Sequence, residues 1–173
     1  MTPETVQQPK PYAIIKQCYH CHDNIKDTRI GYNDKTFCCE GCKTVYQILN
    51  ENDMCAYYAI DSNAGVNQLG KTPQYAYLDD AETASKIIDF QDDEQSKITF
   101  YIPAMHCASC IWLLENLYKI NKGIYHSMVN FLKKEVVILF YNKQTTLREV
   151  AETLSKIGYA PEVNLYDVDK EKS

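Results

Sequence analysis

The sequence predicts an α+β protein made of two unlike parts. Between residues 97 and 165, segments with the two-residue period of a strand alternate with segments that have the spacing of a core-facing helix. Between residues 13 and 60 lie six of the chain's eight cysteines, in a segment too short to bury a sufficient core unaided. A chain of 173 residues has room for two such parts.

Composition and charge argue against nucleic acid and against membrane insertion. The formal net charge is -5 at pH 7, so little would be gained from neutralising phosphates. No apolar run approaches the roughly 18 residues of a membrane helix, and Met1–Thr5 lacks the basic and apolar regions of a signal peptide. We therefore expect a soluble cytosolic chain. In a reducing compartment, closely spaced cysteine pairs indicate metal binding rather than disulfides.

The first part is expected to open with a tight metal-binding turn. Residues 1–12 are rich in proline, glutamine and threonine and predict a disordered lead. Cys18-Tyr19-His20-Cys21 then predicts a turn that aims both sulfurs at one point. Residues 30–37 predict a short hairpin, with Asn33 and Asp34 supplying the turn.

A second group of thiols follows the hairpin, in the segment Cys38-Cys39-Glu40-Gly41-Cys42, and precedes a predicted helix over residues 44–59. One Zn²⁺ bound by four thiolates would stabilise this small domain, because structural zinc sites contribute folding energy directly. The thiolates would come from Cys18, Cys21, Cys38 and Cys42. Cys39 is either a spare thiol or the ligand in place of Cys38. Cu(I) is the alternative metal for this cluster, since five sulfurs could hold more than one ion.

The residues around this cluster are expected to have structural roles. His20 and His22 are possible substitute ligands, but we expect them to be surface residues. We expect Cys55 to be a buried thiol at the end of the domain rather than a ligand. Residues 61–96 are weakly patterned and are interpreted as a linker, with a possible short helix over residues 79–90.

The second part, residues 97–165, has the clearest pattern. Alternating Ile98, Phe100 and Ile102 predict a half-buried strand that ends at Pro103. The segments expected after it are a helix over 109–120, strands over 124–132 and 135–141, a helix over 146–157 closed by Gly158, and a last strand over 159–163. This βαββαβ order predicts a ferredoxin-like sandwich, followed by a tail at 166–173.

The first loop of this sandwich carries a C-x-x-C pair. Cys107 is expected in the loop and Cys110 in the first helical turn, where free backbone N–H groups favour the thiolate. Two soft thiolates without further obvious donors suit Cu(I). His106 is a possible third ligand, Met105 is expected to pack beneath the site, and Tyr159 could either shield the metal or be a plain core residue. A dithiol redox site is the main competitor, but the flanking residues and the remaining elements differ from a thioredoxin fold.

Both cysteine-bearing segments resemble known families. The turn, hairpin and helix of residues 13–60 resemble a treble-clef or TRASH-type zinc finger. Residues 97–163 resemble a heavy-metal-associated domain through Met105, Cys107, Cys110 and Gly158-Tyr159-Ala160, although Ala104 replaces the usual glycine.

The whole chain resembles the cytosolic N-terminal region of a copper-transporting P-type ATPase of the FixI/CcoI type. The motifs that carry this resemblance are Phe37-Cys38-Cys39-x-Gly41-Cys42, the run through His106, Cys107, Cys110, Trp112, Leu113 and Glu115, and Val129-Asn130.

The resemblance implies a metal-receiving or regulatory region on the cytoplasmic side of a membrane protein. Its partners would be a copper chaperone or a thiol-buffered copper pool, and the membrane and catalytic domains of the pump. The chain has no phosphorylation or nucleotide domain and is expected not to be an enzyme by itself, whereas the parent protein would be an ATP-driven translocase. The alternative is a stand-alone copper metallochaperone or metal-responsive binding protein.

Overall fold

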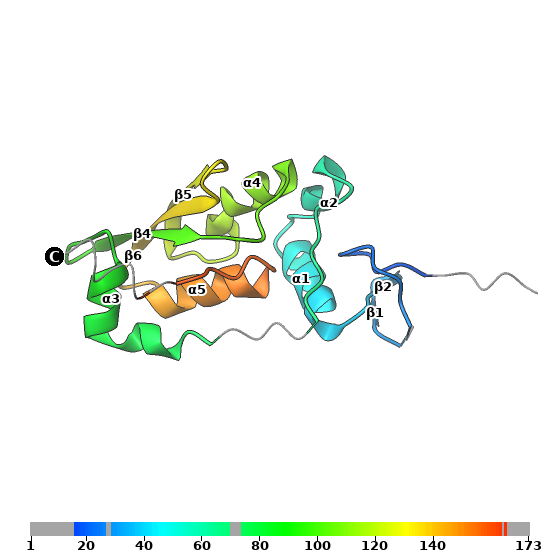
Figure 1. The fold of residues 1–173 in the computed structure, drawn as a ribbon, viewed down its shortest axis with the longest axis horizontal. Coiled ribbons are helices and arrows are strands. Elements are labelled where there is room, and N and C mark those ends of the chain that lie inside the picture. The colour runs from blue at the N-terminus through cyan, green and yellow to red at the C-terminus, as the bar shows by residue number, and fades with distance from the viewer. Residues whose placement is uncertain (1–15, 27–28, 70–73, 164, 166–173) are drawn as a thin grey trace, which may run out of the picture.

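The computed structural model describes residues 16–26, 29–69, 74–163 and 165. Within them a small cysteine-rich unit lies at one end of the molecule and a four-stranded sheet with its helices at the other (Figure 1). The predicted lead at 1–12 and tail at 166–173 lie outside the described residues.

The cysteine-rich unit consists of a hairpin and two helices. The elements are β1 (Gly31–Tyr32), β2 (Lys35–Thr36), α1 (Glu40–Glu51) and α2 (Ala56–Ile60). The predicted turn is confirmed, because Asn33 and Asp34 both have positive φ, at 48° and 61°. Such residues tolerate the left-handed region better than most, which is why they close a two-residue hairpin loop.

The single helix predicted over residues 44–59 is wrong, because two helices occupy this region. The first starts four residues earlier, since the Cys39 side chain accepts a hydrogen bond from the Cys42 N–H and caps α1. It stops before Asp53, which adopts a positive φ of 56°, and the Met54 N–H then returns to the Leu49 carbonyl at 2.8 Å.

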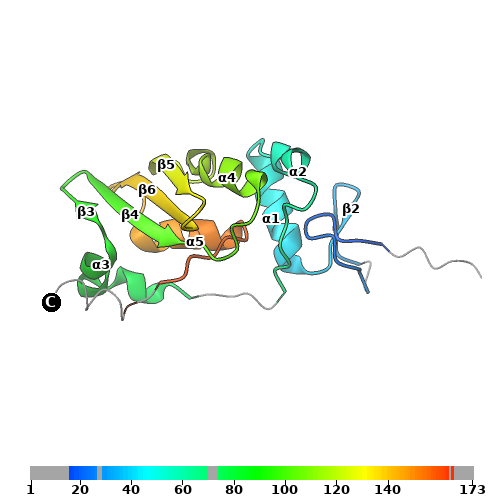
Figure 2. The same ribbon diagram turned by 45° about the horizontal axis from the view of Figure 1, so that its top comes forward.

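The second unit is an antiparallel sheet in the order β3-β4-β6-β5 (Figure 2). Its elements are β3 (Phe90–Gln91), β4 (Gln95–Tyr101), α4 (Ala108–Leu114), β5 (Ile124–Asn130), β6 (Glu135–Tyr141) and α5 (Leu147–Lys156). Alternate residues of β4 and β6 are buried, and Ile98 lies opposite Ile138 in the register. Both helices bury one side in the same core as these strands, which gives the predicted ferredoxin-like α+β arrangement.

Two elements of the second unit differ from the prediction. The helix predicted over 109–120 ends at Leu114 and gives way to a 3-10 turn, η2 (Leu117–Lys119). Asn116 lies at this break, and its side chain donates to the Trp112 carbonyl at 2.6 Å, in competition with helical bonding. The last predicted strand contributes only one bridge, between Tyr101 and Glu162, because β3 already pairs with the other end of β4.

Residues 74–96 pack on the sheet unit. They form η1 (Ala76–Asp79) and α3 (Ala81–Ile87), and the short helix is therefore confirmed with narrower bounds. The Asp80 carboxylate caps α3 by accepting from the Thr83 N–H at 2.9 Å. An ion pair of 2.7 Å joins Asp79 to Arg148 of α5.

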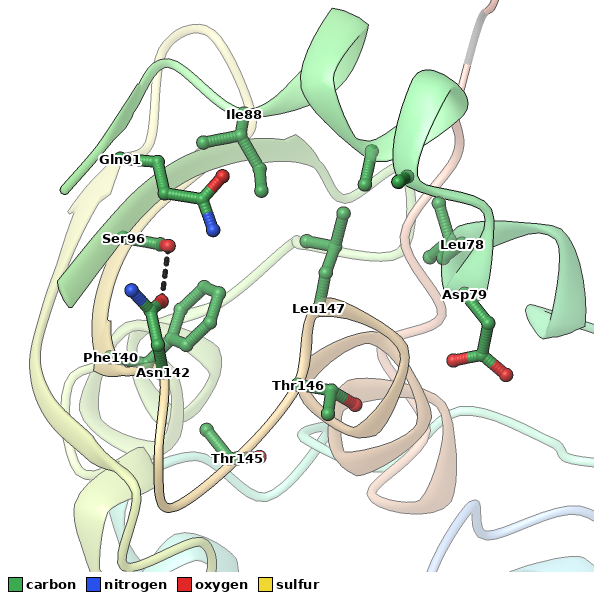
Figure 3. Close-up of a pocket in the computed structure, with 12 residues that line it drawn as sticks. Leu78, Asp79, Ile88, Gln91, Ser96, Phe140, Asn142, Thr145, Thr146 and Leu147 are labelled. Carbon is green, nitrogen blue, oxygen red and sulfur yellow. Dashed lines mark hydrogen bonds between the residues drawn. The ribbon is translucent and has the colours of Figure 1, made fainter. Parts of the chain in front are cut away.

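A cavity of about 280 Å³ lies between α3 and the start of α5 (Figure 3). Its wall combines apolar residues such as Leu78 and Leu147 with polar groups, of which Ser96 donates to Asn142 at 2.5 Å. Helix α3, which lines this cavity, lies at the end of the molecule away from α2 (Figures 1 and 2).

One hydrophobic core runs through both units. Val45 and Leu49 of α1 and Tyr57 of α2 belong to the same buried cluster as the sheet residues Ile98 and Ile138. Helix α1 packs against α5, and α2 packs against α4. The cysteine-rich unit also has a smaller core of its own around Phe37 and Tyr46. The sheet unit therefore supports the helices of the cysteine-rich unit, which has little apolar area of its own.

Candidate metal centres

Four thiols of the cysteine-rich unit converge on one point. The sulfurs of Cys18, Cys21, Cys38 and Cys42 all lie within 4.8 Å of one another. Two of the separations are 3.6 Å, from Cys21 to Cys38, and 3.7 Å, from Cys38 to Cys42. With Zn–S bonds of about 2.3 Å, the edge of a thiolate tetrahedron is about 3.8 Å. The arrangement therefore fits four thiolates around one ion.

Each pair of thiols is held by a separate piece of backbone. A turn positions the first pair. The Cys18 N–H donates to the Asp23 carbonyl at 2.8 Å, and the His22 N–H donates to the Cys18 carbonyl at 2.9 Å. His22 has a positive φ of 66° in this turn. The second pair comes from the end of the hairpin and the first turn of α1. The Tyr19 N–H donates to the Thr36 carbonyl at 2.9 Å, which joins the turn to the hairpin.

Cys39 is not part of this group. It is 7% exposed, and its sulfur accepts the Cys42 N–H at 3.5 Å as the cap of α1. Of the two registers that the sequence left open, the structure brings Cys38 to the cluster and gives Cys39 a role in starting the helix.

The thiols of the cluster differ in acidity. A hydrogen bond with Cys42 lowers the pKa of Cys18 to about 4. The same bond, followed by burial, raises the pKa of Cys42. Burial is the main cause that raises the pKa of Cys21 and of Cys38. One thiolate is thus stabilised by neighbouring thiols, and a cation bound there would replace their protons.

The expectation that both histidines lie at the surface is wrong for His20. His22 is exposed, but His20 is 1% exposed and its ring stacks on that of Tyr57 with centroids 6.3 Å apart. Burial lowers the pKa of His20 to about 4, so the ring is neutral at pH 7. Its Nδ1 lies 2.9 Å from the Tyr58 hydroxyl, while Nε2 has no hydrogen-bond partner among the described residues.

The second candidate centre lies at the start of α4. Cys107 is the N-cap of the helix and Cys110 lies in its first turn, as predicted, and their sulfurs are 3.1 Å apart. His106 Nδ1 lies 3.6 Å from the Cys110 sulfur, so His106 joins the pair in one group of donors. Met105 is fully buried, which confirms its expected place in the packing.

Burial dominates the acidity of Cys107. Burial raises the pKa of Cys107 to about 12, and it outweighs the Cys110 N–H at the helix start, which lowers this pKa as predicted. The Tyr159 hydroxyl lies 2.9 Å from the Cys110 sulfur, so Tyr159 reaches the site. Burial also raises the pKa of Tyr159, which keeps the phenol protonated beside the sulfur.

Cys55 lies apart from both groups. It was predicted to be buried, but it is exposed, and its sulfur donates to the Asn50 side-chain oxygen at 3.6 Å. The break between α1 and α2 turns this position outward, because Cys55 precedes the first turn of α2 instead of lying inside one long helix.

Sequence reasoning missed three residues that surround the second pair. The Ser109 hydroxyl donates to the Tyr57 carbonyl at 2.7 Å, and the Tyr57 hydroxyl lies 2.5 Å from that of Tyr159. The Asn63 carbonyl lies 2.9 Å from His106 Nε2. Tyr57 and Tyr159 are 102 positions apart, and no local pattern relates residues at such a distance. The position of Ser109 between the two cysteines is the one signal in the sequence.

Two family models match separate segments of the chain. Residues 17–92 match the family described as "Putative metal-binding domain of cation transport ATPase", and residues 99–160 match the heavy-metal-associated domain. A copper-transporting ATPase of Helicobacter pylori is 32% identical over 75 residues, which cover 43% of this chain and 10% of that protein. The match thus spans about a tenth of the length of that curated relative.

A solved structure also matches part of this chain. The crystal structure of oxidized MerP from Ralstonia metallidurans CH34 is 20% identical, covers 40% of this chain and 97% of its own, and has a TM-score of 0.37. In the part of the chain that the structure describes, none of the helices combines the length and the apolar character of a membrane span. Residues 17–92 are thus similar to a metal-binding domain of cation transport ATPases, and residues 99–160 are similar to a heavy-metal-associated domain.

Proposed function

We propose that this chain is the cytosolic metal-receiving region of a copper-transporting P-type ATPase of the FixI/CcoI type, and that it accepts Cu(I) on Cys107 and Cys110. The observation that carries the proposal is the close pair of sulfurs, 3.1 Å apart at the start of α4, within a heavy-metal-associated domain. Soft thiolates select Cu(I). In such a pump the membrane-spanning and ATP-hydrolysing parts would belong to other segments.

The surroundings of the pair favour transfer over permanent retention. Cu(I) would arrive from a copper chaperone or a thiol-buffered pool by thiolate exchange, and it would displace protons, because ligand thiols must be deprotonated. Since the pKa of Cys107 is raised to about 12, the incoming ion must drive this deprotonation itself. The neutral Tyr159 hydroxyl, 2.9 Å from Cys110, can donate a hydrogen bond to the thiolate that results.

The four-thiol cluster is proposed to hold Zn²⁺ as a structural ion in a treble-clef-like finger. Its sulfur separations of 3.6 and 3.7 Å are close to a zinc–thiolate tetrahedron, and the ligands come from two backbone segments that the ion would tie together. Cu(I) remains the alternative for this cluster.

Competition for Cu(I) tests the proposal. A chromophoric Cu(I) chelator is titrated against the wild-type chain, against the double variant Cys107→Ser/Cys110→Ser, and against Cys55→Ser as a matched control. Wild type and Cys55→Ser are expected to bind one tight Cu(I) more than the double variant. Unchanged tight binding by the double variant would overturn the assignment. Elemental analysis of the same samples for zinc and copper identifies the metal of the four-thiol cluster.

A further inference from the structure

The cysteine-rich unit lies directly over the Cys107–Cys110 pair. Cys107 is 7% exposed, and Cys110 and Ser109 are fully buried. Helix α2 packs against α4, the helix that carries the pair, and both views show the two helices side by side (Figures 1 and 2). A second protein cannot bring its own thiols to these sulfurs while α2 remains there.

Several polar contacts join residues around the pair to residues 56–64. Ser109 donates its hydroxyl to the Tyr57 carbonyl of α2 at 2.7 Å. His106 Nε2 lies 2.9 Å from the Asn63 carbonyl. The Tyr57 hydroxyl lies 2.5 Å from that of Tyr159, which in turn contacts Cys110. Since two of these contacts use backbone carbonyls of the cysteine-rich unit, their geometry depends on where α2 and the next residues are held.

The segment after α2 is anchored on the turn of the four-thiol cluster. A Cβ on Gly65 would lie 1.6 Å from the His20 carbonyl oxygen, so this backbone passes tightly against the turn. Asn67 donates its side-chain N–H to the Asp23 carboxylate at 2.7 Å, which adds a second attachment. The position of residues 56–64 over the pair is therefore set by the turn that carries Cys18 and Cys21.

We propose that residues 56–64 form a cover over Cys107 and Cys110, which must move aside before a metal donor protein can reach the two sulfurs. The cover and the donor then compete for the same face of α4, the one that carries the pair. The identity of the donor as a copper protein rests on the proposed function. The cover itself rests on the contacts and burial described here.

Thiol alkylation measures the cover without any metal transfer. The full chain is treated with iodoacetamide under reducing conditions, and mass spectrometry of peptides follows each cysteine with time. Cys55, which is exposed in the same chain, serves as an internal reference. When a thiol reacts only after local opening, its alkylation rate is the rate of an exposed thiol multiplied by the fraction of open molecules. We therefore expect Cys107 and Cys110 to react at least about tenfold more slowly than Cys55.

Two glutamate variants at adjacent residues distinguish loss of the cover from an effect of the added charge alone. Ser109→Glu places a carboxylate against Tyr57 of the cover, whereas Ala108→Glu adds the same charge at an exposed position of the same turn. Ser109→Glu is expected to raise the alkylation rates of Cys107 and Cys110 about tenfold or more, while Ala108→Glu leaves them within about twofold of wild type. Slow alkylation of Cys18 and Cys42 in both variants shows that the cysteine-rich unit stays folded.

Tyr57→Phe provides a milder variant, which keeps the ring and removes only the hydroxyl that contacts Tyr159 and Ala64. It is expected to raise the two rates by a smaller factor than Ser109→Glu. The proposal is overturned if Cys107 and Cys110 of wild type react as fast as Cys55, or if the two glutamate variants have equal rates. Loss of Cu(I) binding with preserved protection would instead refute the proposed function and leave the cover intact.

Discussion

The two cysteine groups differ in the backbone segments that supply their thiols and in the distances between their sulfurs. The thiols of the four-thiol cluster come from a turn, a hairpin end and a helix start, and two of its sulfur separations are 3.6 and 3.7 Å. The pair at α4 comes from one short loop, with sulfurs 3.1 Å apart. An ion with four ligands from separate segments holds a fold together, whereas an ion on two local ligands leaves room for the thiols of a donor.

The largest expected effect comes from removing two thiols of the four-thiol cluster. Cys18→Ser/Cys42→Ser should unfold the hairpin and turn, because binding of structural zinc is worth about 10–16 kcal/mol in small finger peptides. Near-ultraviolet circular dichroism reports this loss through the ring cluster of Tyr19, Tyr46 and Tyr58.

The matched control for that variant is Cys107→Ser/Cys110→Ser. It removes the same number of thiols from the other group and should leave the near-ultraviolet signal and Tm almost unchanged. Equal loss of structure in the two double variants would contradict the division into a structural and an exchanging site.

The next effect tests whether the two units share one core. Leu49 of α1 is fully buried in the cluster that also contains Ile98 of the sheet. Leu49→Ala should cost about 2–5 kcal/mol, because truncation leaves a cavity. Chemical unfolding should remain a single transition at a lower denaturant concentration. Leu69→Ala is the control, since Leu69 is 72% exposed. Two separate transitions, with only one shifted, would contradict a common core.

A smaller effect follows from the acidity of Cys107. Burial raises the pKa of Cys107 to about 12 in the folded chain, above the ordinary thiol value near 8.5 in the unfolded chain. Between these values the unfolded state has released the proton and the folded state still holds it. Stability is therefore complete below about pH 8.5 and falls by up to about 1.4 kcal/mol per pH unit above it.

Urea unfolding of the metal-free, reduced chain at pH 8 and at pH 9.5 measures this slope. Wild type should lose more stability over the interval than Cys107→Ser, in which the titrating thiol is missing. If the free energy of unfolding falls equally with pH in the two proteins, the Cys107 thiol does not cause the pH dependence of stability.

Local patterns in the sequence predicted the sheet unit better than the surroundings of the cysteines. The alternation of Ile98 and Phe100 predicted β4, and the run from Glu135 to Tyr141 has the same bounds in β6. The burial of His20 and the raised pKa of Cys107 could not be predicted. Both depend on α2 and the residues after it, which reach the site from far away along the chain.

The cap of α1 shows a different limit. Cys39 is a candidate ligand in the sequence because a shift of one residue in the register would put it in the place of Cys38. Its sulfur instead accepts the Cys42 N–H at 3.5 Å, a role that sequence reasoning assigns first to serine, threonine, asparagine and aspartate. The sequence predicted that the four thiols would gather, but the register between Cys38 and Cys39 depends on where the helix begins.

The smallest predicted effect concerns how the segment before β4 is tied to the sheet unit. Arg148 of α5 forms an ion pair of 2.7 Å with Asp79 of η1 and a second of 2.9 Å with Glu152. Because the arginine is 39% exposed, water and salt screen both pairs, and Arg148→Ala should cost only about 0.2–1 kcal/mol.

Urea unfolding at low and at high salt measures this cost, which should shrink at high salt because screening weakens exposed pairs. Asp79→Asn is the matched variant, since it removes one of the two pairs and should cost less than Arg148→Ala. A cost that exceeds 2 kcal/mol in these variants, or that does not change with salt, would show that the ion pair is buried and holds η1 in place. In that case the segment before β4 would depend on a specific contact with α5, whereas the cover over Cys107 and Cys110 depends on the four-thiol cluster.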